Sequence, residues 1–378
     1  MKIALFVHSL RSCWNHGNAH FLRGVAAELA ARGHEVTAWE EEGGWSAQNL
    51  VRDHGPAALA LWREAYPALE VRTYPPGGPD LGEALDGVDL AIVHEWNRPE
   101  LVAGVGAERR RRPGLRLCFH DTHHRAVTSP EEIFRFDLSG YDAVLAFGAV
   151  LRDVYVRRGA AARVEVWHEA ADVRVFVPLE AERDGDLVFV GNFGDDERTA
   201  ELREFLLEPV RELGLAATVH GVRWPEHGLA ALAEAGIEYR GWLPNHRVPA
   251  ALARHRAGVH VPRRPYAAAL PGIPTIRVFE TLACGVPLVT APWEDAEGLF
   301  RPGRDYLVAR TGAEMVRHLR ALAEEPELAR AVARSGLETV RARHTVAHRV
   351  DELLAVHASL SGGGPGGRRE RAAEALPA

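Results

Sequence analysis

The stretch that decides the fold is Pro271-Gly-Ile-Pro-Thr-Ile-Arg-Val-Phe-Glu-Thr-Leu-Ala-Cys-Gly-Val-Pro-Leu-Val-Thr290. Pro274 and Thr275 suit the start of a helix, where a missing amide hydrogen costs little. Gly285 suits the left-handed position just past a helix end, and the β-rich residues 288–290 follow at once. The pattern therefore predicts a tight loop, a short helix and a buried strand.

The predicted helix carries one acidic residue, Glu280, among apolar neighbours. A helix that starts at a Gly/Pro loop offers free amide hydrogens and a partial positive charge to an anion such as a phosphate. Glu280, about one turn further in, could accept hydrogen bonds from sugar hydroxyls of the same ligand. An i,i+3 ion pair with Arg277 on a solvated helix face explains the residue equally well. The loop residues at the helix start are Gly272, Ile273, Pro274 and Thr275.

Strands alternate with helices on the amino-terminal side of this stretch, through both halves of the chain. Continuous apolar runs such as 3–7 and 90–93 are typical of parallel strands covered on both faces. We predict an α/β fold with two doubly wound Rossmann-like domains that face a cleft. The predicted parts are a first domain (1–170), a second domain (171–345), a helix that returns to the first domain (346–360) and a Gly- and Pro-containing disordered tail (361–378).

Length and composition limit the class of protein. The 378 residues exceed one ordinary core, so two domains are expected. A hydrophobic content of 47% and a charged content of 26% are those of a soluble globular protein. The net charge of -7 argues against nucleic acid as a partner. Lys2 is the only lysine, so a phosphate site in this chain would be built from arginine.

The three cysteines, Cys13, Cys118 and Cys284, lie far apart and form no Cys-x-x-Cys pair. This spacing argues against a zinc module or a disulfide scaffold and fits a reducing cytoplasm. The chain opens on a strand rather than on a signal peptide, and no apolar run approaches the roughly 20 residues of a spanning helix. We therefore predict a cytoplasmic protein without a transmembrane segment.

The first turn between a strand and a helix contains Gly17 and Asn18, without the Gly-x-Gly-x-x-Gly pattern of dinucleotide sites. Close approach of a substrate to this backbone and an ordinary turn glycine explain the position equally well. His20 lies on the first turn of the following helix and is a candidate for contact with a substrate.

Histidines and acids follow two later strands, in His94-Glu95 and in His120-Asp-Thr-His-His124. Open parallel sheets bind ligands beyond the carboxyl ends of their strands. His94, Asp121 and His123 are therefore candidates for hydrogen bonds to an acceptor or to a donor sugar. Satisfaction of strand-end carbonyls is the alternative. No second ligand set has zinc-type spacing, so no metal site is predicted.

The second half carries arginines near a glycine loop. Arg198 follows Gly191 and Asn192 and lies near a helix N-terminus, where positive charge opposes the helix dipole. A bound anion would explain this placement. Arg263 and Arg264 follow a strand end, which directs two further cations to the predicted cleft. Because an arginine fork matches phosphate oxygens, these residues are candidate phosphate contacts.

Several segments of the second half occur in the order of a known family. They are Phe-Val-Gly191 with a following basic residue, Gly241-Trp-Leu-Pro, Val-Pro262 and Phe-Glu280-Thr-Leu-Ala-Cys-Gly-Val-Pro-Leu-Val. This order resembles the C-terminal half of GT-B glycosyltransferases of the family 4 type. The block from Trp293 to Val308 is especially similar to the spore-maturation-type, or CgeB-like, branch.

The resemblance implies a GT-B fold and roles for several residues. Glu280 matches the second acid of a paired-glutamate motif that usually binds the nucleotide ribose. Arg198 sits where a basic residue usually holds the donor diphosphate, and residues 273–275 would lie against the phosphates. The first acid of the pair should lie eight residues before Glu280, and this position is Gly272. The usual donor-sugar contact is therefore absent or made by backbone.

The sequence thus predicts a glycosyltransferase that moves a sugar from a nucleotide-diphosphate donor to a hydroxyl of a small-molecule, lipid-linked or surface-glycan acceptor. The donor is a co-substrate, and no cofactor or metal is expected, because arginines and helix amides can neutralise the diphosphate. The resemblance implies retention of anomeric configuration without an enzymic base, whereas an inverting enzyme would use His20, Asp121 or His123. A sugar-nucleotide epimerase of this fold and a degenerate non-catalytic module, which Gly272 suggests, stay open as alternatives.

Overall fold

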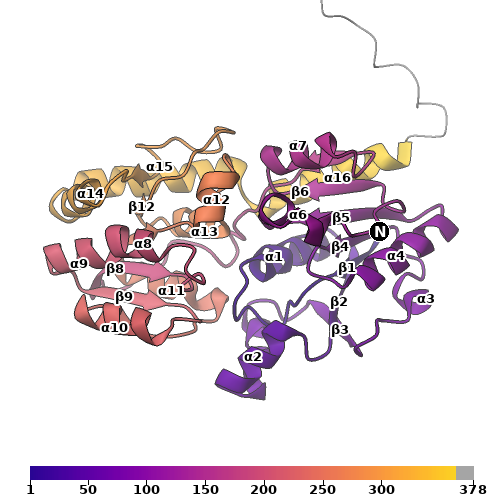
Figure 1. The fold of residues 1–378 in the computed structure, drawn as a ribbon, viewed down its shortest axis with the longest axis horizontal. Helices are drawn as coiled ribbons and strands as arrows, with labels where there is room; N and C mark the ends of the chain where they lie inside the picture. Colours follow the sequence, from indigo (N-terminus) through magenta and orange to yellow (C-terminus); the bar gives the residue numbers. More distant parts are fainter. Residues whose placement is uncertain (363–378) are drawn as a thin grey trace, which may run out of the picture.

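The structure is a computed structural model that describes residues 1–362, and it contains two α/β domains (Figure 1). The first domain lies on the right of this view and the second on the left, and each packs helices around one sheet. The first sheet has seven parallel strands in the order β3-β2-β1-β4-β5-β6-β7, and the second has six in the order β10-β9-β8-β11-β12-β13. Both orders are doubly wound, which confirms the predicted α/β architecture.

The first domain has a core on each face of its sheet. Phe6 of β1 belongs to one apolar cluster, while its neighbour Leu5 belongs to the other, as expected for alternating side chains of a covered strand. Its strands are β1 (Lys2–Phe6), β2 (Glu35–Glu41), β3 (Glu70–Tyr74), β4 (Leu90–His94), β5 (Arg116–Asp121), β6 (Ala143–Ala146) and β7 (Val164–Val166). Its helices are α1 (Asn18–Ala31), α2 (Trp45–His54), η1 (Pro56–Glu64), α3 (Leu81–Ala84), α4 (Pro99–Arg111), α5 (Arg125–Thr128), α6 (Pro130–Ile133) and α7 (Ala149–Arg157).

The second domain repeats this plan with shorter strands. They are β8 (Gly185–Val190), β9 (Ala217–His220), β10 (Glu238–Tyr239), β11 (His255–His260), β12 (Leu288–Thr290) and β13 (Leu307–Val308). Its helices are α8 (Thr199–Leu202), η2 (Arg203–Leu207), α9 (Glu208–Leu213), α10 (Glu226–Glu234), η3 (Asn245–Arg247), α11 (Val248–Ala253), α12 (Arg264–Ala269), α13 (Ile276–Ala283), α14 (Gly312–Glu324) and α15 (Pro326–Arg343).

The last helix, α16 (Val346–Gly362), leaves the second domain and packs against α1 of the first, as predicted (Figure 1). Where the chain crosses, Thr345 pairs with Ala171 in an isolated bridge. The predicted domain boundary at residues 170–171 falls in the segment between β7 and β8. The sequence predicts a tail from residue 361, whereas α16 continues to Gly362, and residues 363–378 lie outside the described residues.

The parallel register gathers polar strand ends at one edge of each sheet. His94 at the end of β4 lies opposite His120 of β5, and His260 at the end of β11 lies opposite Thr290 of β12. Loops from the two edges meet in a contact zone between the domains, which we call the seam. The side chains of Asn15 and Asn192 hydrogen-bond across it.

Candidate functional site

The start of α13 is held by the ends of two neighbouring strands. Thr275 precedes the helix in an extended conformation, yet its side chain does not cap the helix. Its hydroxyl instead contacts Nε2 of His260 at 3.0 Å, and Nδ1 of the same ring contacts Thr290 Oγ1 at 2.9 Å. Gly285 follows the helix with a φ of +64°, and β12 comes next. The predicted loop, helix and strand are confirmed.

Glu280 is buried in the seam and receives hydrogen bonds from both domains. Its Oε1 accepts from Nδ1 of His20 at 2.9 Å and from Nδ2 of Asn245 at 3.0 Å. Its Oε2 pairs with Arg277, which is the i,i+3 pair that the sequence allowed. Burial alone would raise the pKa of this carboxyl, but these three partners hold the pKa below its usual value. Glu280 is therefore an ionised carboxylate about 6 Å along α13 from the helix start.

The N-termini of α1 and α13 meet at the seam. Gly17 precedes α1, and a Cβ atom at this position would lie 2.8 Å from Cγ2 of Ile276, the first residue of α13. Neither helix has an acid in its first turn, so two partial positive charges face the same region. We expected a substrate or an ordinary turn at Gly17, and in this structure a side chain of the facing domain requires the glycine.

Buried side-chain polar atoms without a hydrogen-bond partner among residues 1–362 occur beside these helix starts and also at the ends of β4 and β5. They include both side-chain polar atoms of Asn18, Nε2 of His20 and Nη2 of Arg23. Asn18 is 8% exposed, His20 6% and Arg23 1%. Because an unpaired buried polar group costs about 1–3 kcal/mol, the unpaired atoms beside the helix starts are candidate contacts for a polar ligand.

A second buried acid, Glu169, lies beside the start of α13 and was missed by the sequence reasoning. It follows β7 and is 7% exposed. Burial raises the pKa of Glu169 to about 8 and the charge of Glu280 adds to this, while the Asn18 side chain and the Ile276 amide oppose the shift. Glu169 is thus mainly protonated at neutral pH and can donate a hydrogen bond.

The side chain of Arg198 binds backbone carbonyl groups in this structure. Its guanidinium donates to the carbonyl oxygens of Phe193 at 3.3 Å, Val261 at 2.6 Å and Asn192. Burial lowers the pKa of Arg198 to about 9, and the like charge of Arg263 adds to the shift. Arg198 fastens the loop after β8 to the end of β11. A direct phosphate contact by this residue stays a prediction and requires it to release a carbonyl.

The loop after β8 reaches the seam by close packing. A Cβ atom at Gly191 would lie 2.7 Å from Cζ of Phe189, and a Cβ atom at Gly221 would lie 2.0 Å from the carbonyl oxygen of Gly191. Two neighbouring loops therefore touch backbone to backbone here. Asn192, the next residue, contacts Asn15 of the first domain. Substrate contacts by Gly191 and Asn192 stay predictions.

Arg263 and Arg264 are both paired with acids of their own domain. Arg263 Nε donates to Glu197 at 2.5 Å, and Arg264 Nε donates to Glu201 at 2.9 Å. The side chain of Arg264 is about half exposed, which gives its ion pair little energetic weight. Both residues stay candidate phosphate contacts. To bind a phosphate, each guanidinium would first release its carboxylate partner.

Arg277 is a second cation at a helix start, and the sequence pattern does not indicate its burial. The sequence pattern indicates only a surface partner of Glu280, but the Arg277 side chain is mostly buried and lies in the first turn of α13. A cation at this place opposes the helix dipole, which is the same signal that pointed to Arg198. Applied to α13, it identifies Arg277 as a cation placed for an anion at the helix start.

The predicted histidines of the first domain lie at the ends of β4 and β5. His94 is buried, and its Nε2 contacts Thr122 Oγ1 at 3.1 Å. Burial lowers the pKa of His123 to about 2, with His124 adding to the shift, so the ring is a weak base. The His123 ring packs edge-on against Trp96 at a centroid distance of 5.1 Å. These side chains form part of the first domain's wall of the seam.

The three candidate bases differ in their surroundings. Asp121 is fully buried and uses both carboxylate oxygens, which accept from the Tyr155 hydroxyl at 2.8 Å and from the His123 amide at 3.0 Å. His20 instead presents Nδ1 to the Glu280 carboxylate, while its Nε2 has no partner among residues 1–362. This arrangement fixes the ring and leaves a nitrogen to accept a proton, so the geometry favours His20 over Asp121 and His123.

An ion pair at the end of β4 was also missed. Glu95 is buried and pairs with Arg125, whose guanidinium carbon lies 3.8 Å from the centre of the Trp96 ring. Burial raises the pKa of Glu95 to about 8, and the charge of Asp121 adds to the shift. Trp96 is 42% exposed. The first domain thus presents an exposed aromatic ring beside a buried acid, a combination suited to a carbohydrate or another polyol.

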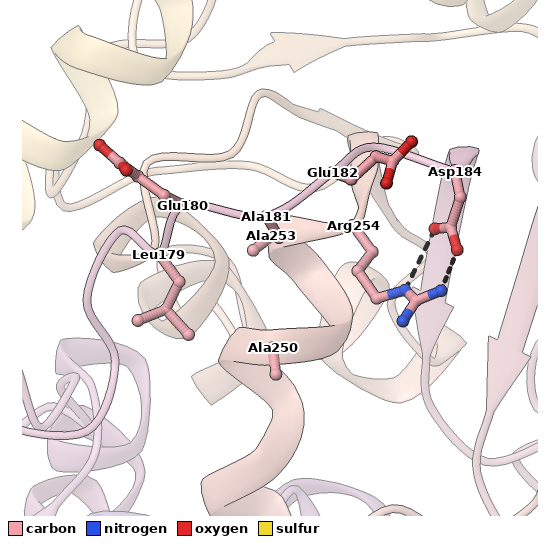
Figure 2. A pocket seen from close by; sticks show the side chains of 8 residues that line it. All are labelled: Leu179, Glu180, Ala181, Glu182, Asp184, Ala250, Ala253 and Arg254. Carbon is pink, nitrogen blue, oxygen red and sulfur yellow. Dashed lines mark hydrogen bonds and ion pairs between the residues drawn. The ribbon is translucent and has the colours of Figure 1, made fainter.

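One hollow of about 280 Å³ lies at the amino end of β8, between residues 179–184, which precede this strand, and α11 (Figure 2). Asp184 and Arg254 pair with each other at its rim, whereas Glu180 lies at the opposite side of the hollow. Arg254 pairs with only one of the three acids of the lining, and no residue of the seam lines the hollow, so we assign it no function. The lining residues are Leu179, Glu180, Ala181, Glu182, Asp184, Ala250, Ala253 and Arg254.

Across the described residues, no three His, Cys, Asp or Glu side chains are grouped so that they could hold a metal ion. Among the helices up to Gly362, none is long and apolar enough to cross a bilayer.

Residues 198–355 match the family model described as glycosyl transferase-like. This range contains α13 and both strands that hold its start. A search of curated protein sequences finds no match to the chain.

Solved structures resemble the chain over nearly its whole length. Sucrose-phosphate synthase from Thermosynechococcus elongatus is 16% identical with a TM-score of 0.67, over 95% of this chain and 99% of that chain. HepE from Anabaena, in complex with UDP and glucose, is 14% identical with a TM-score of 0.65, over 95% and 100%. A glycosyltransferase from Rickettsia africae is 10% identical with a TM-score of 0.65, over 96% and 99%. The chain has the GT-B fold, and together with the family match this supports a glycosyltransferase.

Proposed function

We propose that the protein binds a nucleotide-diphosphate sugar in its second domain and transfers the sugar to an acceptor hydroxyl held by the first domain. The observation that carries the proposal is the meeting of the starts of α1 and α13, without a first-turn acid in either helix, inside a GT-B fold. The glycosyl transferase-like match over residues 198–355 supports the assignment of the donor to the second domain.

In the proposed complex the diphosphate lies at the start of α13, over residues 272–275. The helix amides and Arg277 neutralise the charge that develops on the leaving group. Arg263 and Arg264 supply further cations, and Arg198 acts mainly by holding the loop of Gly191 and Asn192 in place. The protonated carboxyl of Glu169 adds a hydrogen-bond donor to the same anion.

The ribose is proposed to bind Glu280, whose two oxygens suit two neighbouring hydroxyls. For this contact the ligand replaces His20 as the partner of Oε1. The released ring can then face the acceptor, where His94 and Trp96 form the wall. HepE, which shares the fold, has been solved with UDP and glucose, and this makes a UDP-sugar the first donor to test.

The finer features follow the resemblance. We propose membership of the family 4 type, CgeB-like branch, and retention of the anomeric configuration. The acceptor is a small-molecule, lipid-linked or surface-glycan hydroxyl, and neither a cofactor nor a metal takes part, because arginine and helix amides neutralise the diphosphate. The cysteines among residues 1–362 are free thiols, which fits the proposed cytoplasmic location.

Three measurements in sequence test this function. Thermal shift with UDP, GDP, ADP and their sugars detects the donor, and we expect a shift with at least one nucleotide. Nucleotide release with and without an acceptor panel then measures turnover, and NMR of the product reads the anomeric configuration. An epimerase would convert its donor without acceptor, and a degenerate module would show no turnover. No shift with any nucleotide refutes the proposal.

A further inference from the structure

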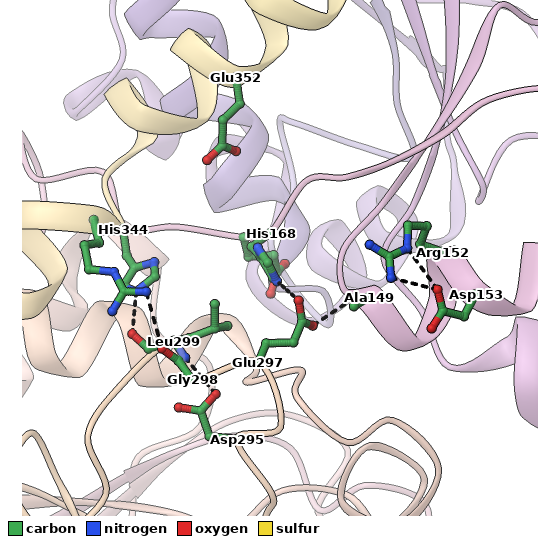
Figure 3. Close-up of polar contacts among 12 residues, drawn as sticks. Ala149, Arg152, Asp153, His168, Asp295, Glu297, Gly298, Leu299, His344 and Glu352 are labelled. Carbon is green, nitrogen blue, oxygen red and sulfur yellow. Dashed lines mark hydrogen bonds and ion pairs between the residues drawn. The ribbon is translucent and has the colours of Figure 1, made fainter. Parts of the chain in front are cut away.

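Glu297 connects the two domains at a second point of the seam (Figure 3). It lies in the loop between β12 and β13 of the second domain. Its Oε1 accepts a hydrogen bond from the amide of Ala149, the first residue of α7, at 2.8 Å. Its Oε2 faces Nε2 of His168 at 3.0 Å. A carboxylate at a helix N-terminus is favoured by the helix dipole, so this bridge is a stable one.

The stem of Glu297 also covers the loop that precedes α13. Gly272 has a φ of +93°, and a Cβ atom there would lie 2.9 Å from Cγ of Glu297. The Gly272 amide donates to the carbonyl of Glu294 at 2.7 Å. The next residue, Ile273, packs so tightly on Gly148 that a Cβ atom at Gly148 would lie 2.3 Å from Ile273 Cγ1. The two loops therefore form one unit that touches the start of α7.

Hydrogen bonds on the second-domain side hold the Glu297 loop in place. The carboxylate of Asp295 accepts from the amides of Leu299 at 2.9 Å and Phe300 at 2.8 Å. Nε2 of His344 contacts the carbonyl of Leu299 at 2.8 Å, at the junction of α15 and α16 where the chain crosses to the first domain (Figure 3). The position of Glu297 is thus set by the second domain, and its contacts with Ala149 and His168 exist only while the domains are together.

We propose that Glu297 is a positioning residue for domain closure, which locks the loop before α13 onto the first domain. The ligand-dependent part rests on the proposed function, because a phosphate at the start of α13 would contact residues 273–275 of the same unit. Ligand binding and closure then stabilise each other, since both need this unit in one place. The need for glycine at position 272 then has an explanation that does not involve sugar recognition, because a side chain there would displace Glu297.

The test compares the full-length protein with Glu297→Ala, Glu297→Gln and the control Glu294→Gln. Glu294 is an exposed acid of the same loop, and its side chain makes no hydrogen bond within the described residues. Small-angle X-ray scattering measures the radius of gyration with and without UDP. Calorimetry measures UDP affinity, and nucleotide release measures KM and kcat.

We expect the wild type and the control to have the same compact radius. Loss of a partly buried charge-assisted contact shifts the closing equilibrium of Glu297→Ala about 10- to 100-fold toward the open form. Because ligand binding and closure stabilise each other, UDP affinity should fall and the donor KM should rise, and kcat should fall by a similar factor. Glu297→Gln keeps the acceptor for the Ala149 amide and should lie between the two.

An unchanged radius of gyration together with unchanged kcat in Glu297→Ala overturns the inference. If the wild type binds no nucleotide, the proposed function fails, but the ligand-free radii still decide whether Glu297 holds the domains together. Circular dichroism checks folding of each variant. If the alanine variant does not fold, Glu297→Gln and His168→Asn, which alter the bridge from either side, carry the same comparison.

Discussion

Replacement of Glu280 by glutamine tests the donor site with almost no change of shape. In the wild type Oε1 receives His20 and Asn245, while Oε2 pairs with Arg277. The glutamine oxygen can receive the same two donors, and the amide group then faces the guanidinium. The substitution therefore removes one buried ion pair and keeps both hydrogen bonds of the seam.

The expected loss has two parts. A hydrogen bond to a charged group contributes about 1.5–3 kcal/mol, so Glu280→Gln should lower the free energy of unfolding by about 2 kcal/mol. The ribose loses one of two carboxylate oxygens, which should weaken UDP binding by about 1–2 kcal/mol, or roughly 5- to 30-fold in Kd. The two losses are measured separately, because binding is read under conditions in which both proteins are folded.

Urea unfolding followed by circular dichroism measures the first loss, and calorimetric titration with UDP measures the second. Glu212→Gln, at an exposed acid of α9, is the matched control and should change neither quantity. A Kd within twofold of the wild type, together with reduced stability, refutes the ribose assignment of Glu280. Unchanged stability refutes the description of the buried pair with Arg277.

Three further measurements test the electrostatics of the seam and its support. Although burial opposes it, a neighbouring arginine and histidine lower the pKa of Cys13 to about 6, so its alkylation by iodoacetamide should rise with pH around 6. Cys118 and Cys284, whose thiol pKa values burial raises, should stay unlabelled, and equal labelling of all three in mass spectra would contradict this. Between pH 6.5 and 8 folded Glu169 keeps a proton that the unfolded chain has released, so stability should fall as pH rises, by at most about 1.4 kcal/mol per unit. Glu169→Gln should flatten this slope in urea unfolding, and an unaltered slope would show that Glu169 is ionised. Arg198→Met should cost about 2–4 kcal/mol, because three backbone carbonyls lose their donor, and an unchanged urea midpoint would count against that account.

Much of the fold is readable from local signals. Pro274, Gly285 and the apolar run that follows predict the loop, α13 and β12, because proline and glycine restrict backbone angles wherever they stand. Alternation of apolar strands and amphipathic helices predicts two doubly wound domains, since a strand covered on both faces must be apolar throughout. The returning helix α16 follows from its apolar spacing and its place after the second domain.

The candidate site is readable only in part. Glu280 and the start of α13 are visible as an acid and a Gly/Pro loop in one short stretch. The roles proposed for Arg277 and Glu169 are not visible in the sequence, because the groups that bury them and the charges around them come from segments far apart in the chain. Arg198 is visible in the sequence as a cation near a helix start, and its phosphate contact stays a prediction. The carbonyls that receive its hydrogen bonds belong to two loops that only the sheet brings together.

By itself, then, the sequence determined the elements, their order and the place of one acidic helix at a sheet edge. Backbone preference and burial act on neighbours along the chain, so they leave a pattern in it. Only the tertiary structure decided that His20, 260 residues away, faces Glu280 and that Glu297 covers Gly272. These partners are decided by distance in space and by competition for a limited number of buried donors. The spacing of residues along the chain contains neither of these two factors.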